Sequence, residues 1–225
     1  MGISVPKMWI RAGFFGMVGL LVVASAIFVL KKPTLNIDVP GTRCLLPPVT
    51  IPPFILADQR GQIFNNDRLM GNWTLAVIGY TYCPDVCPTT LHEMSVLFKQ
   101  FDRPSSKIKA PRFMFLSVDP FRDTPEELGE YVGYFNKDFL GITGTPEEIH
   151  NLVTGLQLFY IYEDPQGIFI RDVLHKPSMD NYAVTHYSGV LFITPRGELV
   201  ATLTPPINAD EVLKVFQKLH AYYGD

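Results

Sequence analysis

Cysteine and charge are both scarce in this sequence, and each shortage excludes a class of protein. The 225 residues include three cysteines, too few for a small secreted domain held together by disulfides. Charged residues make up 18% of the chain and the formal net charge is −3 at pH 7, so we expect no nucleic-acid partner. Apolar residues reach 47%, enough for one globular domain with a full core. Cysteine or metal chemistry is therefore expected to be functional rather than structural.

An uncharged apolar run occupies residues 12–30, close to the amino end. As a helix with a rise of about 1.5 Å per residue it would be roughly 28 Å long, enough to cross a bilayer. Two basic residues precede it and two follow it, so positive charge does not decide its orientation. We expect a single-pass anchor after a cytoplasmic tail at residues 1–11. A cleaved signal ending in the small residues 24–26 is the alternative.

The setting of this anchor is expected to be a bacterial inner membrane. The amino end is not rich in arginine and serine, as a mitochondrial transit peptide would be. A short tail and a large carboxyl-terminal part suggest that the folded domain lies in the periplasm.

Prolines crowd residues 31–53, which predicts an extended tether rather than a helix or a central strand. Cys44 lies in this segment, with no second cysteine at motif spacing. It is either a spare thiol or an additional redox or metal contact. The folded domain is expected at residues 54–225.

Apolar spacing within this domain predicts alternating strands and helices. Residues 73–80 and 112–118 are short apolar runs typical of buried strands, and residues 88–101 carry apolar side chains at helical spacing. Start signals and further apolar runs predict helices from Thr124, Thr145 and Asn208 and strands at 187–194 and 198–203. This order, with a cysteine pair after the first long strand, predicts an α/β sandwich of the thioredoxin kind.

The cysteine pair lies in the segment YCPDVCP, residues 82–88, where a strand gives way to a helix. The helix dipole and free N–H groups there favour the thiolate, which is both a nucleophile and a soft metal ligand. Proline after each cysteine predicts a loop that leads into the helix. The sulfurs of Cys83 and Cys87 could form a disulfide or share one ion, and thiolates suit copper(I) or zinc better than magnesium. A structural role is the alternative, although so short a loop gains little from closure.

His186 differs from the other histidines in its position. It directly precedes the apolar strand at 187–194, which in a thioredoxin-like order would lie beside the strand that leads to the cysteines. Spacing alone makes it a candidate ligand and no more. For the remaining histidines a surface or packing role is expected: His92, His150, His175 and His220.

Four segments resemble, in order, the signature segments of the Sco/SenC family: residues 79–88 (GYTYCPDVCP), 115–128 (FLSVDPFRDTPEEL), 141–149 (GITGTPEEI) and 182–200 (YAVTHYSGVLFITPRGELV). That family comprises membrane-anchored, thioredoxin-fold copper proteins that help to assemble the dinuclear copper centre of cytochrome c oxidase. The resemblance implies copper, as Cu(I) or Cu(II), bound by Cys83, Cys87 and His186.

The function that the resemblance implies is that of a metallochaperone. Its partners would be the copper-bearing oxidase subunit, other copper chaperones or thiol reductants, and the membrane. The alternative is an enzyme, a thiol–disulfide oxidoreductase that acts on the cysteines of that subunit through Cys83 and Cys87. Such reductases usually carry CxxC and a proline before the facing strand, whereas three residues separate these cysteines and His186 stands before Val190 without a proline. Both features favour copper binding, and one protein could do both.

The chain departs from the family pattern at Thr185, where the family commonly has aspartate. A carboxylate that supports the neighbouring histidine is therefore lost or replaced by a hydroxyl, which affects affinity rather than ligand identity. Asp85 and Asp119 match acidic positions of the family and are expected in a loop and a turn, without copper contact. Met94 and Met114 lie among apolar residues and are expected in the core.

Overall fold

The computed structural model describes residues 35–103 and 108–224. The chain divides into two compact units, residues 1–36 and 37–225, and the second is the folded domain. Within the described residues, no helix has the length and apolar character needed to cross a bilayer. The span expected at residues 12–30 and the tail before it lie outside the described residues.

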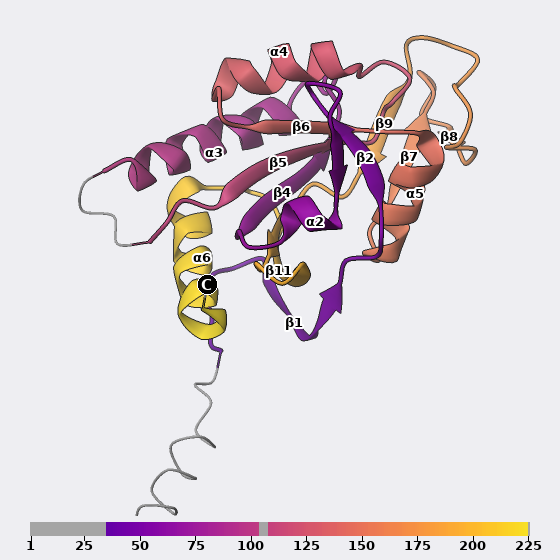
Figure 1. Ribbon diagram of the computed structural model, residues 1–225. Helices are drawn as coiled ribbons and strands as arrows, with labels where there is room; N and C mark the ends of the chain where they lie inside the picture. Colours follow the sequence, from indigo (N-terminus) through magenta and orange to yellow (C-terminus); the bar gives the residue numbers. More distant parts are fainter. Residues whose placement is uncertain (1–34, 104–107, 225) are drawn as a thin grey trace, which may run out of the picture. The chain divides into compact units, whose positions relative to one another are not determined.

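A mixed sheet forms the centre of the folded domain (Figure 1). Its described strands are β1 (Thr42–Thr50), β2 (Ile55–Asp58), β3 (Ile63–Asn65), β4 (Thr74–Gly79), β5 (Arg112–Ser117), β6 (Leu140–Thr143), β10 (Val190–Ile193) and β11 (Glu198–Leu203). They follow the order β1-β11-β10-β4-β5-β6-β2-β3. A smaller sheet has the order β8-β7-β9, with β7 at Tyr160–Glu163, β8 at Phe169–Ile170 and β9 at Ala183–His186.

Helices cover both faces of the large sheet. The described helices are α2 (Asn66–Leu69), α3 (Val86–Phe101), α4 (Pro125–Phe135), α5 (Pro146–Gly155) and α6 (Ala209–Tyr223). Ala76 and Ile78 of β4 share one apolar cluster with Leu152 of α5. On the opposite face, the ring of Phe98 in α3 lies 6.2 Å from that of Phe113 in β5. These layers confirm the predicted α/β sandwich.

The centre of the sheet follows the predicted order closely. β4 runs parallel to β5, and β10 pairs with β4 in the antiparallel sense, with Val190 opposite Val77 and Ile193 opposite Thr74. Every residue of β4 is buried, as expected for a central strand. The cysteine segment therefore leaves the carboxyl end of the innermost strand.

The predicted helix starts are confirmed because each has a local chemical signal. Thr124 forms a complete capping box with Glu127, the side chain of Thr145 accepts the N–H of Glu148, and Asn208 caps α6. Helix α3 begins at Val86, two residues before the predicted start. Cys83 thus lies in a loop, whereas Cys87 lies in the first turn of the helix.

Several strands differ from the sequence-based expectation. Residues 42–50, expected to belong to an extended tether, form the edge strand β1, which pairs with β11. An edge position tolerates the prolines of this segment because half of its N–H groups face solvent. The strand expected at 187–194 is confined to β10, and His186 ends β9 of the smaller sheet instead.

Candidate metal centre

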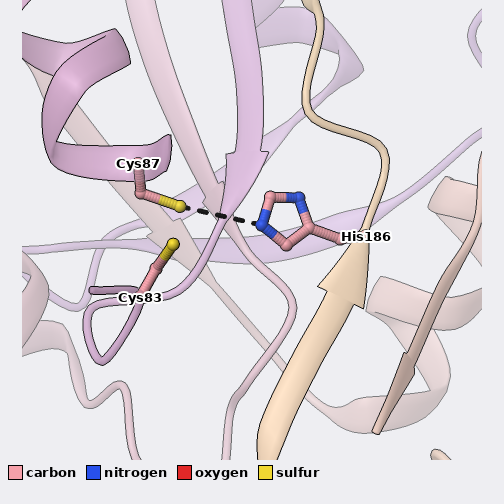
Figure 2. A group of neighbouring side chains, drawn as sticks. All are labelled: Cys83, Cys87 and His186. Carbon is pink, nitrogen blue, oxygen red and sulfur yellow. Dashed lines mark hydrogen bonds between the residues drawn. The ribbon is translucent and has the colours of Figure 1, made fainter. Parts of the chain in front are cut away.

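The three predicted ligands lie together at the carboxyl end of β4 (Figure 2). Cys83 lies in the turn after this strand, and its N–H donates to the carbonyl of Tyr80 at 3.2 Å. Cys87 opens α3, and His186 comes from the end of β9. One ligand atom from each residue lies within 4.8 Å of the other two, so a single ion could contact all three.

The sulfur of Cys87 has a defined position because Gly79 lies beneath it. A Cβ atom at residue 79 would stand 2.7 Å from Cys87 Sγ and 2.7 Å from Cε2 of Phe115. Both distances are too short for any real contact, and Cys87 itself is buried. The absent side chain of Gly79 is therefore what allows α3 to bring this thiol close to the sheet.

The imidazole of His186 presents Nε2 to the sulfurs. Its Nδ1 lies 2.9 Å from the carbonyl oxygen of Tyr187, which accepts a hydrogen bond and therefore places the proton on Nδ1. Nε2 then carries the free lone pair and lies 3.7 Å from Cys87 Sγ. The ring also packs edge to face on Tyr80, with 6.0 Å between ring centres.

The thiols share one proton. A hydrogen bond from Cys87 lowers the pKa of Cys83 well below its usual value, with further help from backbone N–H groups. The same hydrogen bond, together with burial, raises the pKa of Cys87. The resting pair is thus a thiolate at Cys83 and a thiol at Cys87, and an ion that binds both must displace the Cys87 proton.

The other residues considered at the sequence level lie outside this cluster. Met94 and Met114 are buried in the core, as predicted. Asp85 is exposed at the start of α3. Thr185 turns away from the sulfurs, and its hydroxyl donates to Glu163 Oε2 at 2.9 Å. Cys44 lies in β1 at the sheet edge, and burial raises its pKa.

The remaining histidines also occupy surface or packing positions. His92 and His175 are exposed, and Nδ1 of His175 pairs with Asp172 at 2.9 Å. The ring of His150 lies 6.1 Å from that of Tyr160, and the ring of His220 lies 6.2 Å from that of Trp73. His186 is the histidine that the fold brings to the thiols.

Sequence reasoning missed the surroundings of the ligands. Asp119 lies in a turn after a strand, as expected, but its full burial and its hydrogen bonds from Arg122 and from the hydroxyl of Tyr182 were not predicted. Asp123 is also buried and holds Thr81, two residues before Cys83. Three charged residues directly after a buried strand, in DPFRD, were the signal that could have indicated a structured turn.

The chain is similar in sequence to known proteins. The sequence profile of the SCO1/SenC family matches residues 46–221. SCO2-like protein RP587 from Rickettsia prowazekii is 32% identical over 165 residues, which cover 73% of this chain and 74% of the relative.

Two solved structures with copper bound have a similar fold. ScoI from Arabidopsis thaliana is 26% identical, with a TM-score of 0.64 over 77% of this chain and 99% of that one. Yeast Sco1 is also 26% identical, with a TM-score of 0.64 over 79% and 91% of the two chains. Because the family profile covers well over half of the residues, the chain belongs to the SCO1/SenC family.

Proposed function

We propose that this protein is a membrane-anchored metallochaperone that binds copper through Cys83, Cys87 and His186 and helps to deliver it to the dinuclear copper site of cytochrome c oxidase. The observation that carries the proposal is the convergence of two sulfurs and one imidazole nitrogen within 4.8 Å. Copper-bound structures of similar proteins and the family resemblance support the choice of ion.

The donor set suits a transferable soft ion. Two thiolates and an imidazole stabilise Cu(I) in a low-coordinate site, which leaves room for a ligand from a partner. The site also lies near the surface, since Tyr82 is 59% exposed and Val86 is 40% exposed on either side of Cys83. An incoming thiolate or imidazole could therefore bind before the first protein ligand leaves, which is what transfer by ligand exchange requires.

A second function, thiol–disulfide exchange, is favoured by the state of the cysteine pair. The lowered pKa of Cys83 makes it a thiolate, the form that attacks disulfides, and the neighbouring Cys87 could resolve the mixed disulfide. Copper binding and disulfide formation compete for the same sulfur atoms. In the periplasm that we propose for this domain, a reductant would have to keep the pair able to bind copper.

The test of the chaperone proposal is a Cu(I) titration of the reduced full-length chain in detergent, against a chromophoric chelator. We expect one tightly bound ion per chain and an affinity reduced by about 10-fold or more in His186→Ala. The matched control is His175→Ala, at an exposed histidine, which should bind like the wild type. Unchanged affinity in His186→Ala, together with rapid reduction of a disulfide substrate, would favour the oxidoreductase instead.

The proposed location is tested by protease treatment of spheroplasts that express the chain with a carboxyl-terminal tag. If the folded domain lies in the periplasm, added protease removes the tag without lysis of the cells. A tag that is protected until the inner membrane is broken would contradict this orientation.

A further inference from the structure

The ligands come from segments far apart in the chain, and something must set the distance between them. Cys87 and His186 are 99 positions apart and belong to α3 and to β9 of the smaller sheet. β9 pairs with β7 and not with the central strands among the described residues. The pairing of β9 therefore does not tie the imidazole directly to the strand that leads to the sulfurs. The turn at residues 119–123, after β5, contacts both segments.

On the cysteine side, this turn acts through Asp123. Its carboxylate accepts the N–H of Thr81 at 3.0 Å and the hydroxyl of Thr81 at 2.6 Å. It also accepts the hydroxyl of Ser117 at 2.6 Å. Asp123 is 1% exposed, so these hydrogen bonds are shielded from water and hold the start of the cysteine loop firmly.

On the histidine side, the turn acts through Asp119 and Arg122. Asp119 accepts the hydroxyl of Tyr182 at 2.6 Å and the Nε–H of Arg122 at 2.5 Å. Arg122 in turn donates to the carbonyls of Tyr182 at 2.9 Å and Asp180 at 3.2 Å. These carbonyls lie just before β9, so Arg122 fixes the strand that ends in His186. The N–H of Asp119 donates to Ser117 Oγ at 3.0 Å, which joins the two sides into one network.

The guanidinium of Arg122 also contacts the aromatic residues of both segments. Its Cζ lies 3.7 Å from the ring centre of Tyr182, 4.8 Å from that of Tyr82 and 5.7 Å from that of Tyr80. Tyr82 directly precedes Cys83, and Tyr80 packs against the ring of His186. A cation this close to the rings gains cation–π energy, which ties the side chains around the site together.

We infer that Arg122 is a positioning residue that sets the separation between the sulfurs of Cys83 and Cys87 and the imidazole of His186. The inference rests on the proposed copper-binding function. It adds a residue that shapes the site without contacting the ion. Lysine could keep the ion pair with Asp119, but it could not reproduce the planar fork that reaches two carbonyls while stacking on tyrosine.

The test compares Cu(I) affinity in full-length wild type, Arg122→Met and Arg122→Lys. Methionine keeps the apolar stem and removes the charge and the donors. We expect Arg122→Met to bind Cu(I) about 10- to 100-fold more weakly and Arg122→Lys to recover part of the loss. The matched control is Arg196→Met, because Arg196 also pairs with a carboxylate, that of Glu198 at 3.0 Å, and its Cζ lies 5.9 Å from the Tyr223 ring centre. It should change affinity by less than about 2-fold.

A double-mutant cycle separates positioning from general destabilisation. If Arg122 acts through His186, Arg122→Met should have little further effect on Cu(I) affinity when His186→Ala is already present, less than about 3-fold. The signature of the Cu(II) form in electron paramagnetic resonance should also change in Arg122→Met and stay unchanged in Arg196→Met. Equal losses in both backgrounds, or wild-type affinity in Arg122→Met, would overturn the inference.

Folding of each variant is checked by circular dichroism. If Arg122→Met does not fold, Tyr182→Phe provides the second variant, because it removes only the hydroxyl that donates a hydrogen bond to Asp119. It should give a smaller loss of affinity that again depends on His186. If His186→Ala itself binds Cu(I) like the wild type, the proposed function fails; if His186→Ala weakens binding and the Arg122 and Tyr182 variants do not, only the positioning role fails.

Discussion

At the scale of single residues, the site depends on the space left by the missing side chain of Gly79 as much as on the ligands themselves. Gly79 ends β4 and lies beneath Cys87, and Phe115 fills the rest of the space. The distances leave no room for even one additional carbon atom. Because protein interiors are close-packed, such a position has few ways to relax.

We expect Gly79→Ala to lower the free energy of unfolding by about 1–3 kcal/mol, since the new methyl group must displace the Cys87 sulfur or the Phe115 ring. Urea unfolding measures this change, and the Cu(I) titration should show weaker binding. Gly133→Ala is the matched control, because a Cβ at this helical glycine would meet no atom within 4 Å beyond its chain neighbours and the backbone of its own helix. It should be neutral or stabilising by up to about 1 kcal/mol. Equal effects at both glycines would contradict the steric argument.

Asp123 gives the stability a specific pH dependence. Burial raises the pKa of this carboxyl to about 6, so the folded state binds the proton more tightly than the unfolded chain does. Stability from this residue therefore increases as the pH falls through 6 and is absent well above it, with a gain of about 2 kcal/mol between pH 7 and pH 4.5. Urea unfolding of wild type and Asp123→Asn at both pH values measures the gain as the change in their difference. A difference that does not vary with pH would rule out the raised pKa.

At the scale of elements, the sequence predicted helices well and short strands poorly. Thr124, Thr145 and Asn208 mark helix starts with side-chain hydrogen bonds that form locally, so the sequence alone carries the signal. The long buried strands β4 and β5 were likewise visible as apolar runs. β7, β8 and β9 have four, two and four residues, too few for a periodic pattern, and they depend on pairing between distant segments.

The same limit explains what was missed at the site. The resemblance pointed to Cys83, Cys87 and His186, and the structure brings them together. Spacing alone did not distinguish His186 as a ligand, because its position depends on β9, a strand that the pattern did not predict. The roles of Arg122 and Asp123 could not be inferred either, since they arise from contacts across the fold.

The cap of α4 allows a test of the element-scale argument. Thr124→Ala removes one half of a capping box, the hydroxyl that accepts the N–H of Glu127, and we expect it to lower the free energy of unfolding by about 1 kcal/mol. Thr154→Ala is the control, because its exposed hydroxyl bonds only to carbonyls of its own helix. That variant should change stability by less than about 0.5 kcal/mol. Thermal unfolding monitored by circular dichroism compares the two, and equal stabilities would contradict the capping role.

At the scale of the whole molecule, a bound ion would join parts of the fold that are otherwise linked mainly by side chains. One ion would bind ligands from α3, from the loop before it and from β9. Copper should therefore stabilise the folded state by about 2.7 kcal/mol when free Cu(I) is roughly 100 times its Kd. Differential scanning calorimetry with and without Cu(I) measures the shift in Tm, and a chelator should reverse it. Cys83→Ser should lose most of the shift; an undiminished shift would place the ion elsewhere.

The separation of the described strands into two sheets bears on how a bound ion could leave the site. Among the described strands, β9 pairs with β7 alone, while β4 belongs to the larger sheet. Movement of β9 away from the sulfurs would leave the pairing within the larger sheet intact, but it would break the hydrogen bonds of Arg122 to Tyr182 and Asp180 and expose the buried Val184. A bound ion is therefore expected to leave by exchange with an incoming ligand while the imidazole stays in place.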